Sequence, residues 1–322
     1  MGKQLRIVFM GTPEFAVATL GSLLMNGFNV VGVVTATDKP SGRGRKITKP
    51  AVKEFAEFSY LPIMQPADLK DPVFIDELKK LNPDLFIVAA FRMLPEVIWR
   101  IPPMGTINLH ASLLPHYRGA APINHAIING EHTTGVTTFM IDNKIDTGNI
   151  LMREEIPIFA FENAGDLHDR LMIHGARLVI RTIIGLADQS LIPKSQSQFL
   201  EPGEIPKPAP KIFPENCIID WNNDPHKIHN FIRGLSPYPC ARSFFIISGQ
   251  KLLFKIYESY PESVTHDLAG GSIVTDGRQF MKIACKGGFV NILNLGAEGR
   301  RRMNIADFLM GAGITGSKTL TS

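Results

Sequence analysis

Short, continuous apolar runs alternate with helix-like segments over roughly the first 185 residues, and this alternation limits the possible folds more than any other feature. The apolar runs predict strands at 5–10, 30–36, 85–90 and 106–110, and the spacing between them predicts helices at 14–27, 51–59 and 73–81. Such strands are typical of a parallel sheet with helices on both faces. Ligands of these sheets bind beyond the carboxyl ends of the strands, so we expect functional residues there.

The rest of the chain follows a different pattern. Residues 163–187 predict one long helix, and a segment rich in Pro, Ser and Gln follows it. After a short helix at 226–235 come several β-rich runs separated by turn residues, which favour a small barrel or sandwich. We therefore predict an α/β fold with a Rossmann-like, mostly parallel sheet, followed by a smaller C-terminal β-barrel. The predicted parts are a catalytic domain (1–188), a linker (189–211) and a barrel domain (212–322).

Composition adds limits on location and partners. The amino terminus carries no apolar run long enough for a signal peptide or a membrane span, so we expect a cytoplasmic protein. The three cysteines lie far apart without a CxxC pair, and we predict no metal site. Residues 205–322 hold 14 Lys and Arg against 9 Asp and Glu, whereas residues 1–204 hold 20 against 21. A basic second part fits a domain that meets a polyanion, and equally a slightly basic solvated surface.

Three polar residues form the strongest candidate for chemistry. Asn108 and His110 are one residue apart at the end of a predicted strand, so both side chains point to one face. Asp146 lies in a D-T-G turn, where glycine lets the backbone bend. An amide, an imidazole and a carboxylate suit acyl transfer to an amine, because Asn108 and His110 can stabilise a tetrahedral oxyanion while Asp146 orients the imidazole and helps to remove a proton.

The motifs around these residues resemble those of the folate-dependent formyltransferases. The resemblance rests on N-x-H at 108–110, S-L-L-P-x-x-R-G at 112–119, T-G-V-T at 134–137 and D-x-G at 146–148. Three further motifs and the C-terminal domain resemble the branch of that family that acts on methionyl-tRNA; the motifs are F-M-G-T-P-E-F at 9–15, D-K-P-x-G-R-G-R-K at 38–46 and I-D-W at 219–221. One departure is the loop after 90, where the family shows Tyr-Gly-x-Ile-Leu-Pro and this chain has the shorter Phe91-Arg92-Met93-Leu94-Pro95.

The resemblance implies an activity, two substrates and a set of site residues. The activity is transfer of formyl from 10-formyltetrahydrofolate to the α-amine of methionyl initiator tRNA, for translation initiation. Asn108, His110 and Asp146 would be catalytic, and the second domain would be a tRNA-binding barrel resembling an OB fold. Ser112, Leu113, Leu114 and Pro115 would line the folate site, with backbone at 88–91 and 140–146 holding the pterin. Arg118 fits either a substrate contact or a loop tie, and we expect a monomer.

Residues 38–50 are strongly basic. Two glycines and two prolines predict an exposed loop without helix or strand, placed beside the crevice at the carboxyl end of the second strand. Such a loop can clasp the phosphate backbone of tRNA. The predicted tRNA-binding residues are Lys39, Arg43, Arg45, Lys46 and Lys49, with Arg43 as the main contact.

Three other functions fit part of the pattern. A formyltransferase for a small amine, such as a sugar nucleotide or a purine precursor, needs neither the basic loop nor the basic second domain. A hydrolase that transfers formyl to water would use the same three residues. An RNA-binding protein without catalysis would not need Asp146.

Overall fold

The computed structural model describes residues 4–41, 46–247, 250–312 and 318–319, which form two compact units. Described residues from 1–119, 134–156 and 168–208 make the first unit, and those from 120–133, 157–167 and 209–322 make the second. The units therefore interleave along the chain. Helix α5 (Pro122–Ile128) belongs to the second unit, where it packs against α7 (Pro225–Leu235).

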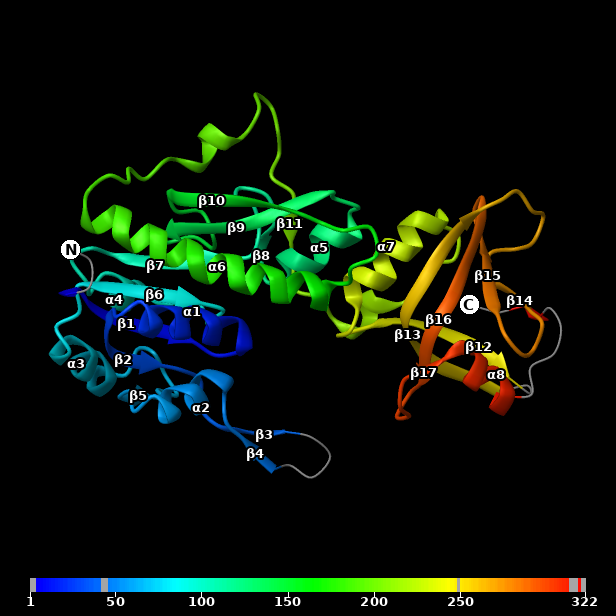
Figure 1. Cartoon of the computed structure of the whole chain (residues 1–322), viewed down its shortest axis with the longest axis horizontal. Helices are drawn as coiled ribbons and strands as arrows, with labels where there is room; N and C mark the ends of the chain where they lie inside the picture. The colour runs from blue at the N-terminus through cyan, green and yellow to red at the C-terminus, as the bar shows by residue number, and fades with distance from the viewer. Residues whose placement is uncertain (1–3, 42–45, 248–249, 313–317, 320–322) are drawn as a thin grey trace. The chain divides into compact units, whose positions relative to one another are not determined.

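A mostly parallel sheet forms the centre of the first unit (Figure 1). Its strand order is β10-β9-β7-β6-β1-β2-β5; β5, β2, β1, β6 and β7 run parallel, and β9 is antiparallel to β7. The strands are β1 (Arg6–Gly11), β2 (Asn29–Val34), β5 (Ile63–Met64), β6 (Leu85–Ala89), β7 (Thr106–His110), β9 (Thr133–Met140) and β10 (Ile150–Pro157). This arrangement confirms the predicted Rossmann-like α/β fold.

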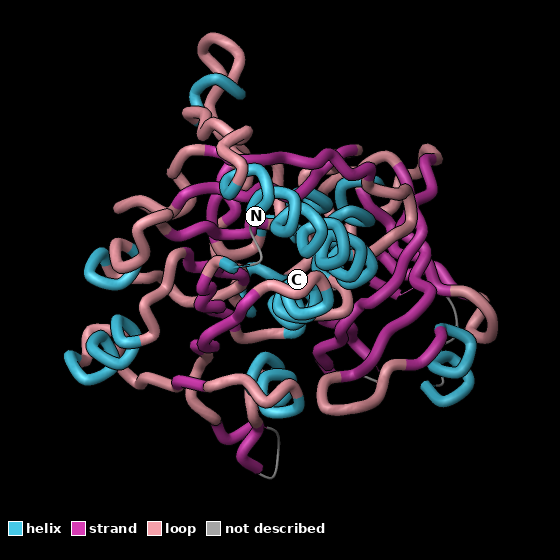
Figure 2. Tube along the Cα trace, turned by 60° about the vertical axis from the view of Figure 1, so that its left-hand side comes forward, coloured by secondary structure: helices cyan, strands magenta, loops and turns pink. Residues whose placement is uncertain are grey.

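Helices cover both faces of this sheet; Figure 2 draws helices in cyan and strands in magenta. They are α1 (Glu14–Met25), α2 (Ala51–Phe58), α3 (Pro72–Lys80), α4 (Glu96–Trp99) and α6 (Ala164–Ala187). On one face Met10 and Phe86 pack with Phe74 of α3 and Ile98 of α4. On the other, Thr182 of α6 shares a hydrogen bond with Thr138 of β9. Burial on both faces explains why the strands read as continuous apolar runs.

Short polar signals in the sequence begin the helices. Asp71 accepts a hydrogen bond from the Val73 N–H and precedes Pro72 at the first position of α3. Asp224 does the same for α7, where Pro225 follows it. Each cap satisfies backbone N–H groups that have no partner within the helix.

The sheet reverses its order of growth at β1, and this fixes where a ligand crevice lies. From β1 the chain adds β2 and β5 on one side, then returns to add β6 and β7 on the other. In open α/β sheets the carboxyl ends of the strands at such a switch point bind the ligand. Gly11 ends β1 there, and a Cβ at this position would lie 2.9 Å from the Ala89 carbonyl oxygen at the end of β6. The glycine therefore permits close approach of the two strands.

Two features of the first unit differ from the sequence expectation. The basic segment was predicted to contain no strand, and this is wrong: β3 (Lys39–Ser41) pairs antiparallel with β4 (Lys46–Thr48). In a two-stranded ribbon Pro40 loses little, because each strand has one free edge where a missing N–H is tolerated. Strands β9 and β10 were also not expected; β9 carries the T-G-V-T motif, and β10, at the edge of the sheet, follows the D-T-G turn.

An antiparallel sheet that curls into a half-barrel builds the second unit, as predicted for the C-terminal part. The strand order is β12-β13-β16-β15-β14-β18, with β17 beside β16. Helix α7 and helix α8 (Ile305–Ala312) contribute Ile232 and Leu309 to a core with Phe245 and Phe254. The strands are β12 (Ala241–Ile247), β13 (Gln250–Ser263), β14 (Ser272–Thr275), β15 (Met281–Cys285), β16 (Gly288–Ala297), β17 (Met303–Asn304) and β18 (Lys318–Thr319). The remaining short elements are β8 (Arg118–Gly119), η2 (Gln196–Phe199), β11 (Pro208–Ala209) and η3 (Pro214–Cys217).

Helix α7 buries two basic side chains inside the second unit. Arg233 is 8% exposed and donates to the carbonyl oxygens of Phe159 and Glu162. One turn earlier, His229 is 8% exposed and its Nδ1 lies 3.1 Å from the Ser259 hydroxyl. Burial, and then the charge of Arg233, lowers the pKa of His229 to about 4. The imidazole is therefore neutral in the folded protein at neutral pH.

This burial predicts a pH-dependent loss of stability that depends on His229. The unfolded imidazole has an ordinary pKa and binds a proton below about pH 6.5, whereas the folded one resists until about pH 4. Stability from the neutral ring is thus complete above pH 6.5 and declines as the pH falls towards 4. Between pH 7.5 and pH 5, the wild-type chain should lose ~2 kcal/mol more unfolding free energy than His229→Gln. Denaturant unfolding at both pH values measures this, and parallel losses in the two proteins would contradict it.

Candidate active site

His110 and Asp146 face each other in the first unit. His110 ends β7, and its Nδ1 lies 3.8 Å from Asp146 Oδ2, with the two side chains 7% and 13% exposed. The other ring nitrogen, Nε2, lies 2.8 Å from the Tyr117 carbonyl oxygen. A carbonyl only accepts, so Nε2 carries a hydrogen and Nδ1 is left facing the carboxylate. The Nδ1–Oδ2 distance is longer than a direct hydrogen bond. A polar atom of a substrate can therefore lie about 3 Å from both Nδ1 and Oδ2.

Asn108 lies on the same face of β7 as His110. The strand register pairs Asn108 with Val88 of β6 and Phe139 of β9, and His110 with Thr137 of β9. Alternation along β7 therefore directs both side chains to the side of the sheet that α3 and α4 cover. Asn108 is partly exposed, and its amide makes no hydrogen bond with the other described residues. Two N–H groups remain for a ligand.

The predicted folate-lining stretch, residues 112–115, is held in the loop after β7 by packing and hydrogen bonds. Ser112 and Leu114 are fully buried; the Ser112 hydroxyl donates to the His116 carbonyl, and Leu114 packs with Phe139. Buried Thr137 connects the stretch to β9, because its hydroxyl donates to Ser112 O and accepts from Leu114 N. Pro115 is also buried, and Leu113 is half-buried. These side chains hold the loop after β7, and their contact with folate stays a prediction.

The turn that carries Asp146 is held from several directions. Asp146 has a φ of 54°, in the left-handed region that costs a non-glycine residue about 1 kcal/mol or more. Its carboxylate accepts a hydrogen bond of 3.0 Å from the Gly119 N–H. A Cβ at Gly148 would lie 1.6 Å from the Met140 carbonyl oxygen, so the turn lies directly against the end of β9. The D-T-G motif thus has a steric reason for its glycine.

Gln196 is a site residue that the sequence analysis missed. It lies in η2 within the segment predicted as a linker, and it is 4% exposed. Its amide bonds the Asp146 turn and accepts from Arg118. Arg118 therefore ties the loop, one of the two roles that the sequence left open. The surrounding Ser- and Gln-rich sequence has no apolar periodicity, so only tertiary contacts reveal this residue.

The loop after β6 borders the crevice. Ala90 has a φ of 46°, so the backbone leaves the strand in a left-handed turn. Arg92 donates to the carbonyl oxygens of Ala67 and Pro66, and its guanidinium stacks over the Phe91 ring. Arg92 thereby fastens this loop, where the sequence departs from the expected Tyr-Gly motif, to the segment after β5.

The basic ribbon β3–β4 is only partly described. Lys39 is exposed, whereas Lys49 forms a 2.7 Å ion pair with Glu57 that raises the pKa of Lys49. Asp38, the one acid of the segment, bonds Gln65 and Lys53, and these contacts lower the pKa of its carboxyl. Arg43 and Arg45 lie outside the described residues, as does the Lys46 side chain.

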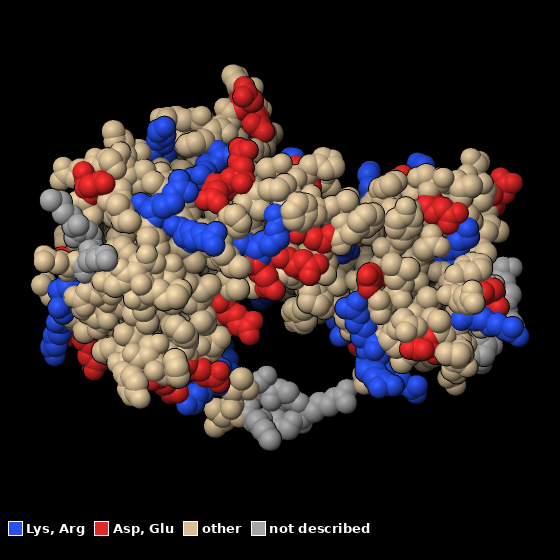
Figure 3. Space-filling view, in the orientation of Figure 1, with Lys and Arg blue, Asp and Glu red and all other residues tan. Residues whose placement is uncertain are grey.

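Charged residues elsewhere on the first unit pair with each other. Figure 3 shows positive and negative side chains intermixed over β10 and α6. There Glu154 accepts from both His174 and Arg181, at 2.6 and 3.0 Å. Side chains of both signs therefore share this face, and it is not a field of one sign.

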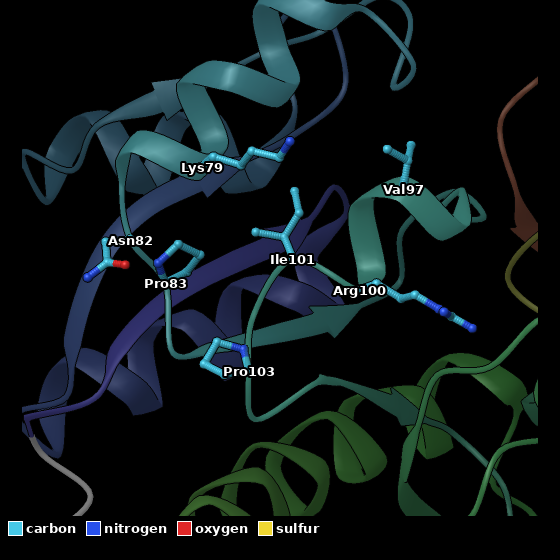
Figure 4. A pocket seen from close by; sticks show the side chains of 7 residues that line it. All are labelled: Lys79, Asn82, Pro83, Val97, Arg100, Ile101 and Pro103. Carbon is cyan, nitrogen blue, oxygen red and sulfur yellow. The ribbon is translucent and has the colours of Figure 1, made fainter.

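A depression of about 410 Å³ lies at the amino ends of β6 and β7, the opposite ends of these strands from His110 (Figure 4). It is formed where β6 and β7 begin, and Ile101 lies between Lys79 of α3 and Val97 of α4. None of the polar residues described above lines it. The lining residues are Lys79, Asn82, Pro83, Val97, Arg100, Ile101 and Pro103.

Two properties apply to the described part of the chain. It holds no group of three or more His, Cys, Asp and Glu side chains placed to bind a metal. None of its helices combines the length and hydropathy that crossing a membrane requires.

The fold and the polar cluster agree with one family. The N-terminal formyl transferase domain matches residues 5–183, and the formyl transferase C-terminal domain matches residues 211–313. The chain belongs to the formyl transferase family. Among its curated relatives are proteins named methionyl-tRNA formyltransferase, from Bacteroides thetaiotaomicron at 48% identity over 310 residues and from Flavobacterium johnsoniae at 51% over 309 residues. Each alignment covers 96% of this chain and 96% of the relative.

Solved structures share the fold at lower identity. HypX from Aquifex aeolicus in complex with tetrahydrofolic acid matches 95% of this chain and 47% of its own, with a TM-score of 0.63 and 17% identity. The N-formyltransferase from Helicobacter canadensis, in complex with folinic acid and dTDP-3-aminofucose, matches 93% of this chain and 100% of its own, with a TM-score of 0.61 and 20% identity.

The contact between Gly148 and β9 predicts a large effect of Gly148→Ala. The added methyl group meets a backbone oxygen that cannot rotate away, so the turn or the strand must shift. We expect ~1–3 kcal/mol lower unfolding free energy, a typical cost of overpacking. Gly21→Ala in α1 is the matched control, because its Cβ would meet the Phe55 ring of α2 at an ordinary 3.4 Å. Equal stability of the two variants in denaturant unfolding would contradict the prediction.

Proposed function

We propose that this chain transfers the formyl group of 10-formyltetrahydrofolate to the α-amino group of methionyl initiator tRNA, in translation initiation. The observation that carries the chemistry is the nearly buried pair of His110 and Asp146 at the carboxyl end of β7. The named activity of the relatives at 48–51% identity supports the acceptor. The tetrahydrofolate complex of HypX supports a folate as formyl donor.

Each of the three polar residues has a role in this reaction. An α-amine titrates near pH ~7.7–8.0, so an acceptor for its proton helps at neutral pH. The amine nitrogen bonds to the formyl carbon and loses a proton, which the pair of His110 and Asp146 accepts. The pair then returns a proton to the folate nitrogen as its bond to the formyl carbon breaks. The Asn108 amide donates to the carbonyl oxygen, which becomes negative in the tetrahedral intermediate. No covalent bond to the protein is needed.

Folate binding belongs at the switch point. Ala90 and Asp146 both adopt left-handed backbone conformations, and they lie in the two segments expected to hold the pterin, 88–91 and 140–146. Such conformations cluster at ligand sites, which supports these two segments as the place where the heterocycle binds. Ser112, Leu113, Leu114 and Pro115 form the supporting wall of this pocket in our proposal.

Three broader features also remain proposals. We propose a monomer in the cytoplasm. The division 1–188, 189–211 and 212–322 is proposed as the order of functional parts, with tRNA binding in the last. Because α5 packs on α7, the interleaved units imply that cutting the chain at 188 would expose the apolar side of α5.

The acceptor is tested by following radiolabelled formyl from 10-formyltetrahydrofolate. We expect label on methionyl initiator tRNA, and none on charged elongator tRNA. In the same assay Asp146→Asn should lower kcat by at least ~10²-fold, because it removes the carboxylate that assists proton transfer. The Kd for tRNA should stay within about threefold, as expected for an interaction used only in the transition state. Asp76→Asn, an exposed carboxylate on α3 that lies outside this turn, is the control.

Other outcomes of this assay have distinct meanings. Release of label to water without an amine would indicate a hydrolase, and label on a sugar-nucleotide amine would indicate a small acceptor. An unchanged rate in Asp146→Asn would remove this carboxylate from the mechanism.

The basic ribbon predicts a salt-dependent contribution to tRNA affinity. Replacing Lys39, Arg43 and Arg45 by Gln should raise the KM for methionyl-tRNA and reduce the slope of log K against log salt by about one per lost phosphate contact. Lys49→Gln should change both quantities less, because Glu57 already pairs with Lys49. Binding titrations at several salt concentrations measure these slopes. An equal effect of Lys49→Gln would contradict the assignment.

A further inference from the structure

Gln196 uses every hydrogen-bonding group of its side-chain amide. The Nε2 group donates to the carbonyl oxygens of Asp146 and Gly148, both at 2.9 Å. Its Oε1 accepts from Arg118 Nε at 3.0 Å and from Arg118 Nη2 at 2.6 Å. Two donors and two acceptor positions are all that an amide offers. A side chain that is 4% exposed and fully bonded is fixed in one orientation.

These bonds close a ring around Asp146. Gln196 holds the main-chain carbonyl of Asp146, and the Gly119 N–H holds its carboxylate Oδ2 at 3.0 Å. Gly119 follows Arg118, whose guanidinium returns to Gln196. The backbone and the carboxylate of Asp146 are therefore both anchored to groups that Gln196 connects.

The backbone of Asp146 requires such an anchor. Its φ of 54° is unfavourable for a residue with a side chain, and such conformations persist only where the surroundings enforce them. The carbonyls of Asp146 and Gly148 both accept from the one amide group, so Gln196 holds the turn at two points. Loss of these bonds would let the turn relax and move the carboxylate away from His110 Nδ1.

We propose that Gln196 is a positioning residue, which acts through Asp146 to keep the carboxylate facing His110. This inference rests on the proposed function, because the role of Asp146 in formyl transfer is part of it. It also places a residue of the segment predicted as a linker in the support of the active site.

Gln196→Glu tests the bonds that the amide donates separately from those that it accepts. A glutamate keeps an acceptor for Arg118 but loses both donations to the turn, and its second oxygen repels the two carbonyls. We expect kcat to fall ~10–100-fold, in the range that a displacement of about 1 Å causes, while KM for methionyl-tRNA stays within about threefold. Gln198→Glu is the matched control, since Gln198 is exposed in the same short helix.

A double variant separates positioning from a general loss of structure. If Gln196 acts through Asp146, Gln196→Glu should cost little in a protein that already carries Asp146→Asn, because coupled residues are not additive. Independent losses that multiply in the double variant would overturn the proposal. Unchanged kcat in Gln196→Glu with lowered thermal stability would also overturn it and leave Gln196 as a packing residue.

Hydrogen exchange gives a readout that does not depend on activity. The Gly119 amide is protected by its bond to Asp146 Oδ2, so exchange at this amide should be faster in Gln196→Glu and unchanged in Gln198→Glu. Unchanged protection in Gln196→Glu would overturn the positioning role whatever the reaction is. Failure of the wild-type protein to transfer formyl would instead refute the proposed function. If the glutamate variant does not fold, Gln196→Met, which removes all four bonds at similar volume, is measured in the same way.

Discussion

The position of β7 between β6 and β9 determines where Asn108 and His110 of the candidate site lie. Parallel pairing with β6 places the end of β7 at the switch point of the sheet, and antiparallel pairing with β9 fixes which face Asn108 and His110 share. The Thr137 hydroxyl on β9 also holds the loop after β7, because it hydrogen-bonds the backbone of Ser112 and Leu114. The site is thus built on strands buried on both sides, which gives it the rigidity that acid–base chemistry needs.

Loops complete the site, and the sheet holds them in conformations they would not adopt alone. Ala90 and Asp146 both lie in the left-handed region, one after β6 and one in the turn before β10. The free energy that these conformations cost is small beside the burial of Phe86, Ile87 and their neighbours in the strands. Strain of this kind is tolerated where a precise backbone shape serves a ligand.

In the second unit, helix α7 buries the charged Arg233 beside His229. Arg233 is satisfied by carbonyl oxygens, and its charge together with burial keeps His229 neutral. Neither side chain faces a reacting group in the described structure. They fix the 157–167 segment to α7 within this unit, so a segment from the middle of the chain becomes part of its C-terminal unit.

The sequence by itself determined the parallel sheet, the long helix α6 and the curled C-terminal sheet, because apolar periodicity and turn residues are local signals. It also marked Asn108, His110 and Asp146, since their spacing and motifs can be recognised without coordinates. Only the tertiary structure decided that Lys39–Ser41 and Lys46–Thr48 pair as strands, that Lys49 bonds Glu57, and that Ser112 and Leu114 face inwards. It alone revealed Gln196, whose partners Arg118 and Asp146 lie 78 and 50 residues away in sequence. Hydrogen bonds between such distant residues depend on how the strands pair, and no local pattern records that.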